Sequence, residues 1–309
     1  MDSMQYFIDS GLIVLSIGAL WWGAVWVVDS ASSIANRLGI SEIVIGLTVV
    51  AFGTSAPEFA VTLLAAFRSQ ADISVGNIVG SNIFNLGFIL GGVALVRAIN
   101  TSHKLVYRDG SILILSSLLL VCFLYDNSLS QAEGIILFIS LFVYLFLLFI
   151  RKETLEEEIE AVPFHWQEIP KLIIGLVLIV GGGYFLVDSA SNLARTIGLS
   201  EWVIGVTIVA AGTSAPEFAT SLVAIIKKKH GISAGNLVGS NIFNLLGVLG
   251  LAAMIRPMSV DMNAFTSIIM LTGLTVIAIF LMRTGWKISR LDGAILVILN
   301  LLVYVLTIF

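Results

Sequence analysis

Two short stretches of the chain place a carboxyl group beside hydroxyl groups inside long apolar runs. Residues 53–59 read GTSAPEF, and residues 212–218 repeat the same seven letters. The acids are Glu58 and Glu217, each about midway along its run. A carboxylate at the centre of a membrane helix costs about 2.5–3.5 kcal/mol on insertion scales. A chain that carries two of them is therefore expected to use them.

The residues around each acid offer only oxygen ligands. Thr54 and Ser55 lie four and three residues before Glu58, so all three can face one side of a helix. A second duplicated motif, GSNIFN at 80–85 and 239–244, adds a serine and an asparagine four residues apart. Oxygen-only sets favour Ca²⁺, Na⁺ or Mg²⁺ over zinc or copper. The candidate ligands are Thr54, Ser55, Glu58, Ser81 and Asn85, with Thr213, Ser214, Glu217, Ser240 and Asn244.

The prolines next to the acids predict breaks in both helices. Pro57 and Pro216 have no backbone N–H and crowd the preceding turn, so we expect breaks near residues 53–54 and 212–213. The breaks would free backbone carbonyls, such as those of Ala51 and Ala210, for a cation. Non-helical backbone at membrane depth is tolerated only where it lines a cavity or is buried in protein.

Glycines spaced by four residues predict close packing of the next segment. They are Gly76 and Gly80 in the first copy and Gly235 and Gly239 in the second. Such spacing lets membrane helices approach closely, which would carry the asparagines of the second motif to the acids.

An architectural interpretation of the motif is also available. Ser55 and Glu58 have the spacing of a helix capping box, and a proline kink can serve packing alone. The exact duplication, with an acid at the midpoint of each copy, favours a binding site.

The composition indicates a polytopic membrane protein without a soluble domain. Of 309 residues, 58% are hydrophobic and 12% charged, and the mean hydropathy is +1.03. A soluble domain carries about 25% charged residues. Cys122 is the only cysteine, so neither a disulfide framework nor a thiol metal site is expected. The first apolar run, 7–28, is longer than a signal-peptide core and is interpreted as a retained span.

The chain is a duplication with an offset of 159 residues. The register holds without a gap from residue 28 to residue 91. We predict an all-α fold with a first five-helix repeat (1–150), an acidic cytoplasmic linker (151–170) and a second, inverted repeat (171–309). The predicted spans are 5–28, 40–67, 73–96, 107–125 and 132–150, then 171–188, 199–226, 232–255, 263–282 and 289–308.

Charge predicts how the chain crosses the membrane. Three of the 16 Lys and Arg residues fall on the side of the N-terminus and thirteen on the other. The positive-inside rule puts the thirteen in the cytoplasm and both termini outside the plasma membrane. Five spans are an odd number, so the repeats are inverted. Glu58 and Glu217 should then meet near the bilayer centre, where two carboxylates repel unless a proton or a cation lies between them.

At these motifs the sequence resembles the cation/calcium exchanger superfamily, close to its prokaryotic sodium/calcium exchangers. The resemblance covers both repeats. It implies that Glu58 and Glu217 are the central Ca²⁺ ligands and that the other candidate ligands complete the Ca²⁺ site and flanking Na⁺ sites. It also implies that the carbonyls of Ala51 and Ala210 join the Na⁺ sites, and that the first and sixth helices are long, tilted and mobile. Some members carry aspartate where Asn244 stands, which leaves K⁺ dependence open.

The expected function is Na⁺/Ca²⁺ antiport by alternating access. The rivals are a Ca²⁺/H⁺ exchanger, a K⁺-dependent Na⁺/Ca²⁺ exchanger and, less favoured, a cation channel. The sequence has no G-x-x-x-x-G-K-[ST] loop for an ATP-driven pump and no visible nucleophile–base pair for an enzyme. The expected partners are Ca²⁺, Na⁺ and membrane lipid. We expect no nucleic acid, no cofactor, and a protein that works as a monomer.

Overall fold

The computed structural model of the protein describes residues 3–150, 165–198, 208, 210–260 and 262–308. In the first repeat the helices are α1 (Ser3–Leu38), α2 (Glu42–Ile45), η1 (Gly46–Val50), α3 (Ala51–Thr54), α4 (Ala56–Phe67), α5 (Ala71–Phe84), η2 (Asn85–Ile89), α6 (Leu90–Val96), η3 (Leu105–Gly110), α7 (Ser111–Phe123), η4 (Leu124–Asp126) and α8 (Gln131–Ile150). In the second they are α9 (Glu168–Thr196), α11 (Ala210–Thr213), α12 (Ala215–Ile226), α13 (His230–Ile242), η6 (Phe243–Val248), α14 (Leu249–Ile255), α15 (Met262–Arg283), η7 (Thr284–Trp286) and α16 (Arg290–Ile308).

The all-helical membrane fold is confirmed, and every one of these helices overlaps or adjoins a predicted span. Within the described residues, seven helices are long and apolar enough to cross a membrane, or eight if the bent segment from Glu42 to Phe67 counts as one span. The seventh predicted span begins at residue 199, and residues 199–207 and 209 lie outside the described part of the chain. So do residues 151–164 of the predicted linker.

The first and sixth helices are much longer than their predicted spans. Helix α1 has 36 residues and α9 has 29, against predictions of 5–28 and 171–188. The predicted spans end at residues 28 and 188, next to or at an aspartate, where hydropathy falls. The helices continue because the polar residues that follow stay packed, with Ser30 and Ser189 both buried. At 1.5 Å per residue, α1 is about 54 Å long and must tilt in a hydrocarbon layer about 30 Å thick.

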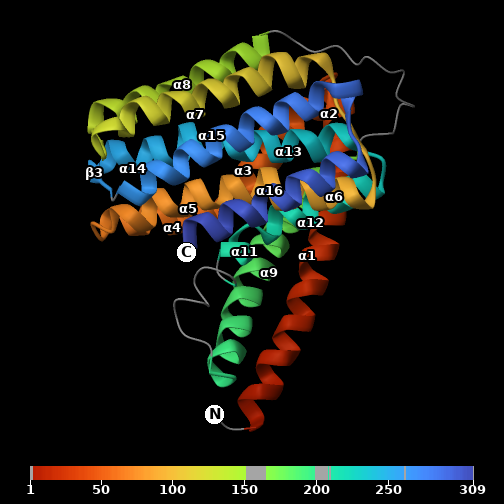
Figure 1. Ribbon diagram of the computed structural model, residues 1–309. Coiled ribbons are helices and arrows are strands. Elements are labelled where there is room, and N and C mark those ends of the chain that lie inside the picture. The colour runs from red at the N-terminus through yellow and green to blue at the C-terminus, as the bar shows by residue number, and fades with distance from the viewer. Residues whose placement is uncertain (1–2, 151–164, 199–207, 209, 261, 309) are drawn as a thin grey trace.

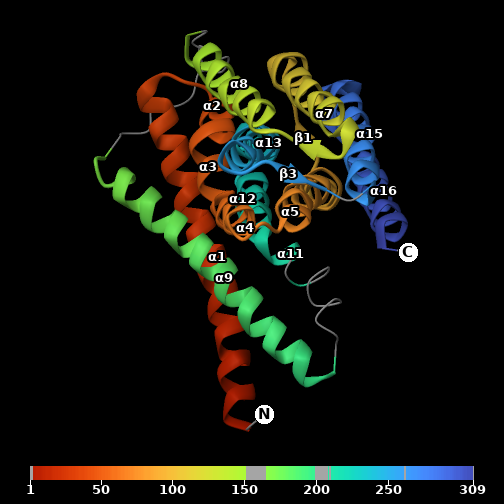
Figure 2. The same ribbon diagram turned by 90° about the vertical axis from the view of Figure 1, so that its left-hand side faces the viewer.

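These two helices pack against one side of the bundle and project from it. They run antiparallel, extend beyond the bundle and cross each other (Figures 1 and 2). The remaining helices form a separate layer of aligned rods (Figure 1). The resemblance implied long, tilted first and sixth helices, and this arrangement agrees with that implication.

Two small antiparallel strand pairs join the repeats and mark the two ends of the bundle. Strand β1 (Ile99–Asn100) pairs with β4 (Lys287–Ile288), and β2 (Ser128–Leu129) pairs with β3 (Met258–Ser259). We call these ends the β1–β4 face and the β2–β3 face. They lie on opposite sides of the bundle (Figure 1).

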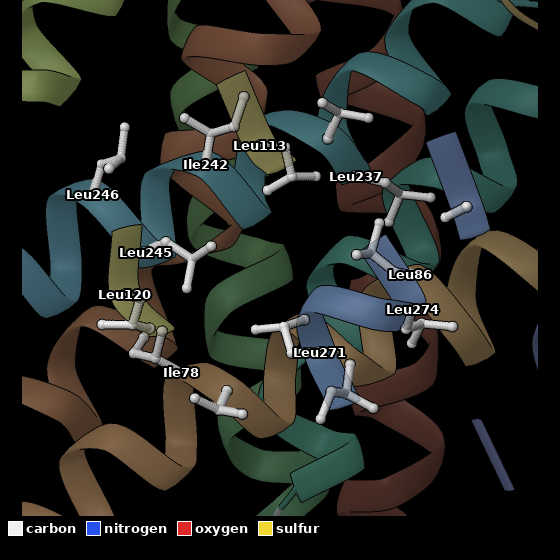
Figure 3. Close-up of a cluster of buried hydrophobic side chains, with 14 of the residues drawn as sticks. Ile78, Leu86, Leu113, Leu120, Leu237, Ile242, Leu245, Leu246, Leu271 and Leu274 are labelled. Carbon is white, nitrogen blue, oxygen red and sulfur yellow. The ribbon is translucent and has the colours of Figure 1, made fainter. Parts of the chain in front are cut away.

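The apolar core lies between the central helices of both repeats. Fully buried aliphatic side chains from α5, η2 and α7 pack against others from α13, η6 and α15 (Figure 3). Ile78, Leu113, Leu237 and Leu271 are among those with no exposed surface. This core fixes the helices that carry the second motif of each repeat.

The glycine-spaced packing is found in the second repeat. A Cβ added at Gly235 would lie 2.7 Å from the carbonyl oxygen of Ile43, and one at Gly239 would lie 2.6 Å from Leu47. Helix α13 therefore approaches the broken helix of the first repeat closely, as predicted. Around Gly76 and Gly80 the described part of the chain places no atom within 4 Å of such a Cβ.

The crossing of α1 and α9 depends on two facing glycines. A Cβ added at Gly23 would lie 2.8 Å from the carbonyl oxygen of Gly175, and one at Gly175 would lie 3.0 Å from that of Gly23. We expect Gly23→Ala or Gly175→Ala to destabilise the protein by about 1–3 kcal/mol, because the added methyl group meets backbone that cannot move aside.

Thermal unfolding in detergent, monitored by circular dichroism, checks this prediction. The matched control is Gly18→Ala, since a Cβ at Gly18 on the same helix α1 meets nothing within 4 Å. An equal change in melting temperature for Gly18→Ala and Gly23→Ala would contradict the close crossing.

Candidate cation site

Both motif helices break beside the acids. Helix α3 ends at Thr54 and α4 begins at Ala56, and the two segments around Ser55 meet at a bend of 50°. In the second repeat α11 and α12 are separated by Ser214, whose ψ of 7° leaves the helical range. The breaks fall one residue later than predicted. They set Pro57 and Pro216 in the first turn of the following helix, where a missing N–H is tolerated.

The serine at each break binds the acid of the other repeat. The Ser55 hydroxyl donates to Glu217 Oε1 at 3.1 Å, and the Ser214 hydroxyl donates to Glu58 Oε1 at 3.1 Å. Ser81 also donates to Glu58 Oε1, at 3.0 Å. Ser55 makes no capping bond to its own helix, so its capping-box interpretation is wrong. This exchange brings the two acids into a single cluster.

Each acid keeps one oxygen without a protein partner. Glu58 and Glu217 are fully buried, and their Oε2 atoms have no hydrogen-bond partner among the described residues. A buried carboxylate oxygen without a donor is expensive. The free energy is recovered if a cation binds there.

The carbonyl of Ala51 lies in the cluster, but the proline does not free it. Its oxygen still accepts the Ser55 N–H at 3.1 Å, together with the hydroxyls of Thr54 at 3.3 Å and Ser240 at 3.5 Å. The expectation of a freed Ala51 carbonyl was therefore wrong. In an unbroken helix the N–H of residue 57 would donate to the carbonyl of Gly53, four residues earlier. Proline has no N–H, so the carbonyl that loses its donor is that of Gly53. In the second repeat, Ala210 begins the short helix α11.

The remaining predicted ligands are also buried. Thr54 and Ser240 lie 3.4 Å apart, oxygen to oxygen, and Thr213 is 8% exposed at the end of α11. Neither polar atom of the Asn85 side chain has a partner among the described residues. Asn244 donates to Asn82 at 3.1 Å, while its Oδ1 is unpartnered.

Both asparagines of the second motif sit where the helix widens. A π-helical segment begins at Asn85, and another, Phe243–Val248, contains Asn244. Segments of this kind often mark functional positions in α-helices. The two segments occupy nearly equivalent places in the two repeats, since residues 85 and 244 are related by the offset of 159.

Two positioning residues were missed by the sequence-based selection of ligands. Asn236 donates to the Glu217 carbonyl at 3.4 Å and to Ser221 at 3.0 Å, and it accepts the Thr54 hydroxyl at 3.1 Å. Asn77 makes the corresponding bond to the Glu58 carbonyl at 3.3 Å. The signal was present in the sequence: residues 77, 81 and 85 are polar at intervals of four, as are 236, 240 and 244, and so share one helix face.

Helix α9 packs directly onto both breaks. A Cβ at Gly53 would collide with the side chain of Leu176, and one at Gly212 with that of Val187. These glycines therefore serve contact with the long helix α9. Any movement of α9 along its axis must pass over both carboxylate-bearing segments.

An inverted-repeat membrane bundle with paired broken helices near its centre is the architecture of secondary transporters. The sequence profile of the sodium/calcium exchanger protein family matches residues 9–150 and 169–309. The chain belongs to this family.

Individual relatives extend over nearly the whole chain. "Putative antiporter CaxA" of Alkalimonas amylolytica is 38% identical, covering 92% of this chain and 93% of its own. Sodium/calcium exchanger MaX1 of Methanosarcina acetivorans is 30% identical, covering 92% and 94%. A structure of the sodium-calcium exchanger NCX_Mj, soaked with Na⁺ and Sr²⁺, superposes with a TM-score of 0.85 at 28% identity, covering 96% of this chain and 98% of its own.

The positioning role of Asn236 gives a testable prediction. Asn236→Ala leaves the Thr54 and Ser221 hydroxyls and the Glu217 carbonyl without this buried partner, so we expect Ca²⁺ affinity to fall about ten-fold or more. Binding of radioactive Ca²⁺ to the purified protein measures it. Asn100→Ala is the control, because the Asn100 side chain is exposed. Unchanged affinity in Asn236→Ala would contradict the role.

Proposed function

We propose that this protein exchanges Na⁺ for Ca²⁺ across the plasma membrane by alternating access, with both ions bound around Glu58 and Glu217. The observation that carries the proposal is the pair of Oε2 atoms, on two fully buried acids, that have no partner in the described part of the chain. Two negative charges are balanced by one Ca²⁺, or in part by Na⁺ ions bound at the flanking oxygens. Competition for one site is what couples the two fluxes.

The ligands we assign to this site are the predicted ones. Glu58 and Glu217 bind Ca²⁺ through their carboxylates. The hydroxyls, amide oxygens and backbone carbonyls around them complete the Ca²⁺ site and the Na⁺ sites, and they belong to Thr54, Ser55, Ser81, Asn85, Thr213, Ser214, Ser240, Asn244, Ala51 and Ala210. Hard cations bind such oxygens, and Ca²⁺ takes six to eight of them.

Na⁺ is favoured over H⁺ as the second ion by the neutral oxygens. Proton exchange needs a titrating carboxylate, whereas the cluster adds buried hydroxyls and the wholly unpartnered amide of Asn85. Of the sequence's three histidines, at 103, 165 and 230, none lies inside a predicted span, so none offers a proton relay at depth. The relative MaX1 from Methanosarcina acetivorans is named a sodium/calcium exchanger, which supports Na⁺ as the second ion.

The proposed orientation places the β1–β4 face in the cytoplasm. That face carries Arg97, Lys104, Lys287 and Arg290, which flank β1 and β4, and it includes the basic loop 227–229 next to His230, whose Nδ1 accepts the Asn100 N–H of β1. Positive charge of this kind marks the cytoplasmic side. With this orientation both termini lie outside the cell. We further propose that the protein works as a monomer.

The sharpest test of the ion pair uses purified protein in liposomes loaded with Na⁺. An outward Na⁺ gradient at clamped pH is expected to drive Ca²⁺ uptake, and removal of the gradient to stop it. Equal uptake with K⁺ omitted from both sides indicates exchange without K⁺. Uptake that responds to a pH gradient alone would replace the proposal with Ca²⁺/H⁺ exchange, and ohmic current in a planar bilayer would replace it with a channel.

Neutralising either acid is expected to abolish transport. Glu58→Gln and Glu217→Gln remove charge needed to bind Ca²⁺ but keep the size and hydrogen-bonding capacity of the side chain, so the protein should still fold. Ca²⁺ uptake in the same liposomes checks this, with size-exclusion chromatography as the folding readout. Asp126→Asn, an exposed acid at the β2–β3 face, is the control. Transport retained in both glutamine variants would overturn the site.

A further inference from the structure

An ion pair at the β1–β4 face joins the long helix α1 to the opposite repeat. Lys227, at the end of α12, contacts Asp29 of α1 with 2.5 Å between Nζ and Oδ1. Under the 159-residue offset, Asp29 corresponds to Asp188 and Arg68 corresponds to Lys227. The same pair of charges is therefore present at the other end of the molecule, on α9 and at the end of α4.

That second pair is not formed. Among the described residues, Asp188 and Arg68 make no ion pair with each other, and both side chains are exposed. Two acid–base pairs that are equivalent in sequence therefore differ in the structure: one forms an ion pair and the other does not. Of these two equivalent ion pairs, the described residues form the one at the β1–β4 face and not the one at the β2–β3 face.

Hydroxyl groups on the two long helices show the same asymmetry. At the β1–β4 face, Ser30 donates to Glu168 at 2.8 Å and Ser32 donates to Glu42 at 2.6 Å. Glu42 also pairs with Lys229 at 2.8 Å. Ser30 and Ser32 are therefore tied to α9 and α2, and through Glu42 to the loop that follows α12. The Oγ atom of Ser33 on the same helix, by contrast, has no partner among the described residues.

The equivalent hydroxyls of α9 have no partner. Ser189 and Ser191 correspond to Ser30 and Ser32, and both are buried with unpartnered Oγ atoms among the described residues. By the same offset Asp9 corresponds to Glu168, and position 201, outside the described residues, to Glu42. Buried hydroxyls without partners are costly, and they are explained if their partners are reached in a second conformation.

We propose that these two sets of residues are alternating latches. Asp29–Lys227, with the serine contacts of α1, holds the β1–β4 face closed in the conformation described here. Arg68–Asp188, with Ser189 and Ser191 of α9, closes the β2–β3 face in the other conformation. The proposal rests on the proposed alternating access, and it adds the residues that set the balance between the two states.

The energetic scale of each latch suits a switch. The Asp29 and Lys227 side chains are 40% and 32% exposed, and partly exposed pairs contribute modestly to stability. A strong, buried lock would trap one state. A weak pair at each end shifts the population of the two states about two- to five-fold without stopping the cycle.

Matched reporters test the latches. Ala31 of α1 and Ala190 of α9 are related by the same offset, and in the described conformation Ala31 is buried whereas Ala190 is half-buried. Each is replaced by cysteine in a Cys122→Ser background of the full chain in nanodiscs. The rate of labelling by a water-soluble maleimide reports how often each face opens.

The two latches should act in opposite directions. Asp29→Asn is expected to raise labelling at position 31 about two- to five-fold and to lower it at position 190. Asp188→Asn is expected to lower labelling at position 31 and to raise it at position 190. Changes confined to the mutated helix, or of the same sign at both reporters, would show local loosening and overturn the proposal.

Charge reversal keeps the test independent of folding defects. Asp29→Lys alone should open the β1–β4 face, and Asp29→Lys with Lys227→Asp should restore the original labelling ratio. Hydrogen exchange of residues 29–42 in the chain without added cysteines provides a second readout, with faster exchange expected for Asp29→Asn. The latch would be contradicted if the double variant did not restore the labelling ratio and Asp29→Asn left hydrogen exchange of residues 29–42 unchanged.

The outcome is separable from the proposed function. Opposite shifts in labelling without Na⁺-driven Ca²⁺ uptake would keep the latches and reject the ion assignment. Normal Na⁺-driven Ca²⁺ uptake without opposite shifts in labelling would keep the ion assignment and reject the latches.

Discussion

Two carboxylates buried in one cluster, each with an oxygen that has no hydrogen-bond partner among the described residues, are the constraint on which the rest of this structure depends. Glu58 and Glu217 are held by serines from opposite repeats, so neither repeat can complete the cluster alone. An isolated buried charge is too costly to keep. In the proposed site a cation takes up the remaining oxygens, and under that proposal the stability of the centre is linked to ion binding.

The broken helices and the long helices serve this cluster in different ways. The breaks at Ser55 and Ser214 release each motif from a straight helix and aim its hydroxyl across the repeat boundary. Gly53 and Gly212 let α9 lie directly on the breaks. In the proposed cycle α9 moves across these contacts, and its movement responds to whether the cluster is charged or neutralised. The proposal thereby couples ion occupancy to helix position through contacts between described residues.

Much of this organisation could be predicted from the sequence because duplication turns weak signals into paired ones. The inverted membrane fold and the helix breaks followed from hydropathy, the 159-residue offset and the prolines. The clustering of the two acids followed from the inversion. The lengths of α1 and α9 could not be predicted, because tertiary packing rather than hydropathy keeps the residues after Asp29 and Asp188 helical.

The finer geometry of the site also escaped prediction. Pro57 removes the N–H that would bond the Gly53 carbonyl, whereas the Ala51 carbonyl keeps its bond to the Ser55 N–H. Predicting which carbonyl is freed requires the position of the break to be known to a single residue. The roles of Asn77 and Asn236 required knowing which backbone carbonyls face α5 and α13. The π-helical segments at Asn85 and Asn244 leave no mark in residue spacing.

The most direct test of the central claim is the stoichiometry of Ca²⁺ binding to the purified chain, measured by isothermal titration calorimetry over a series of Na⁺ concentrations. Because one shared cluster holds both acids, the account predicts one Ca²⁺ per chain in the absence of Na⁺. It further predicts that the apparent affinity falls as Na⁺ rises, more steeply than one-for-one competition allows. Two independent Ca²⁺ ions per chain, or an affinity that does not respond to Na⁺, would contradict it.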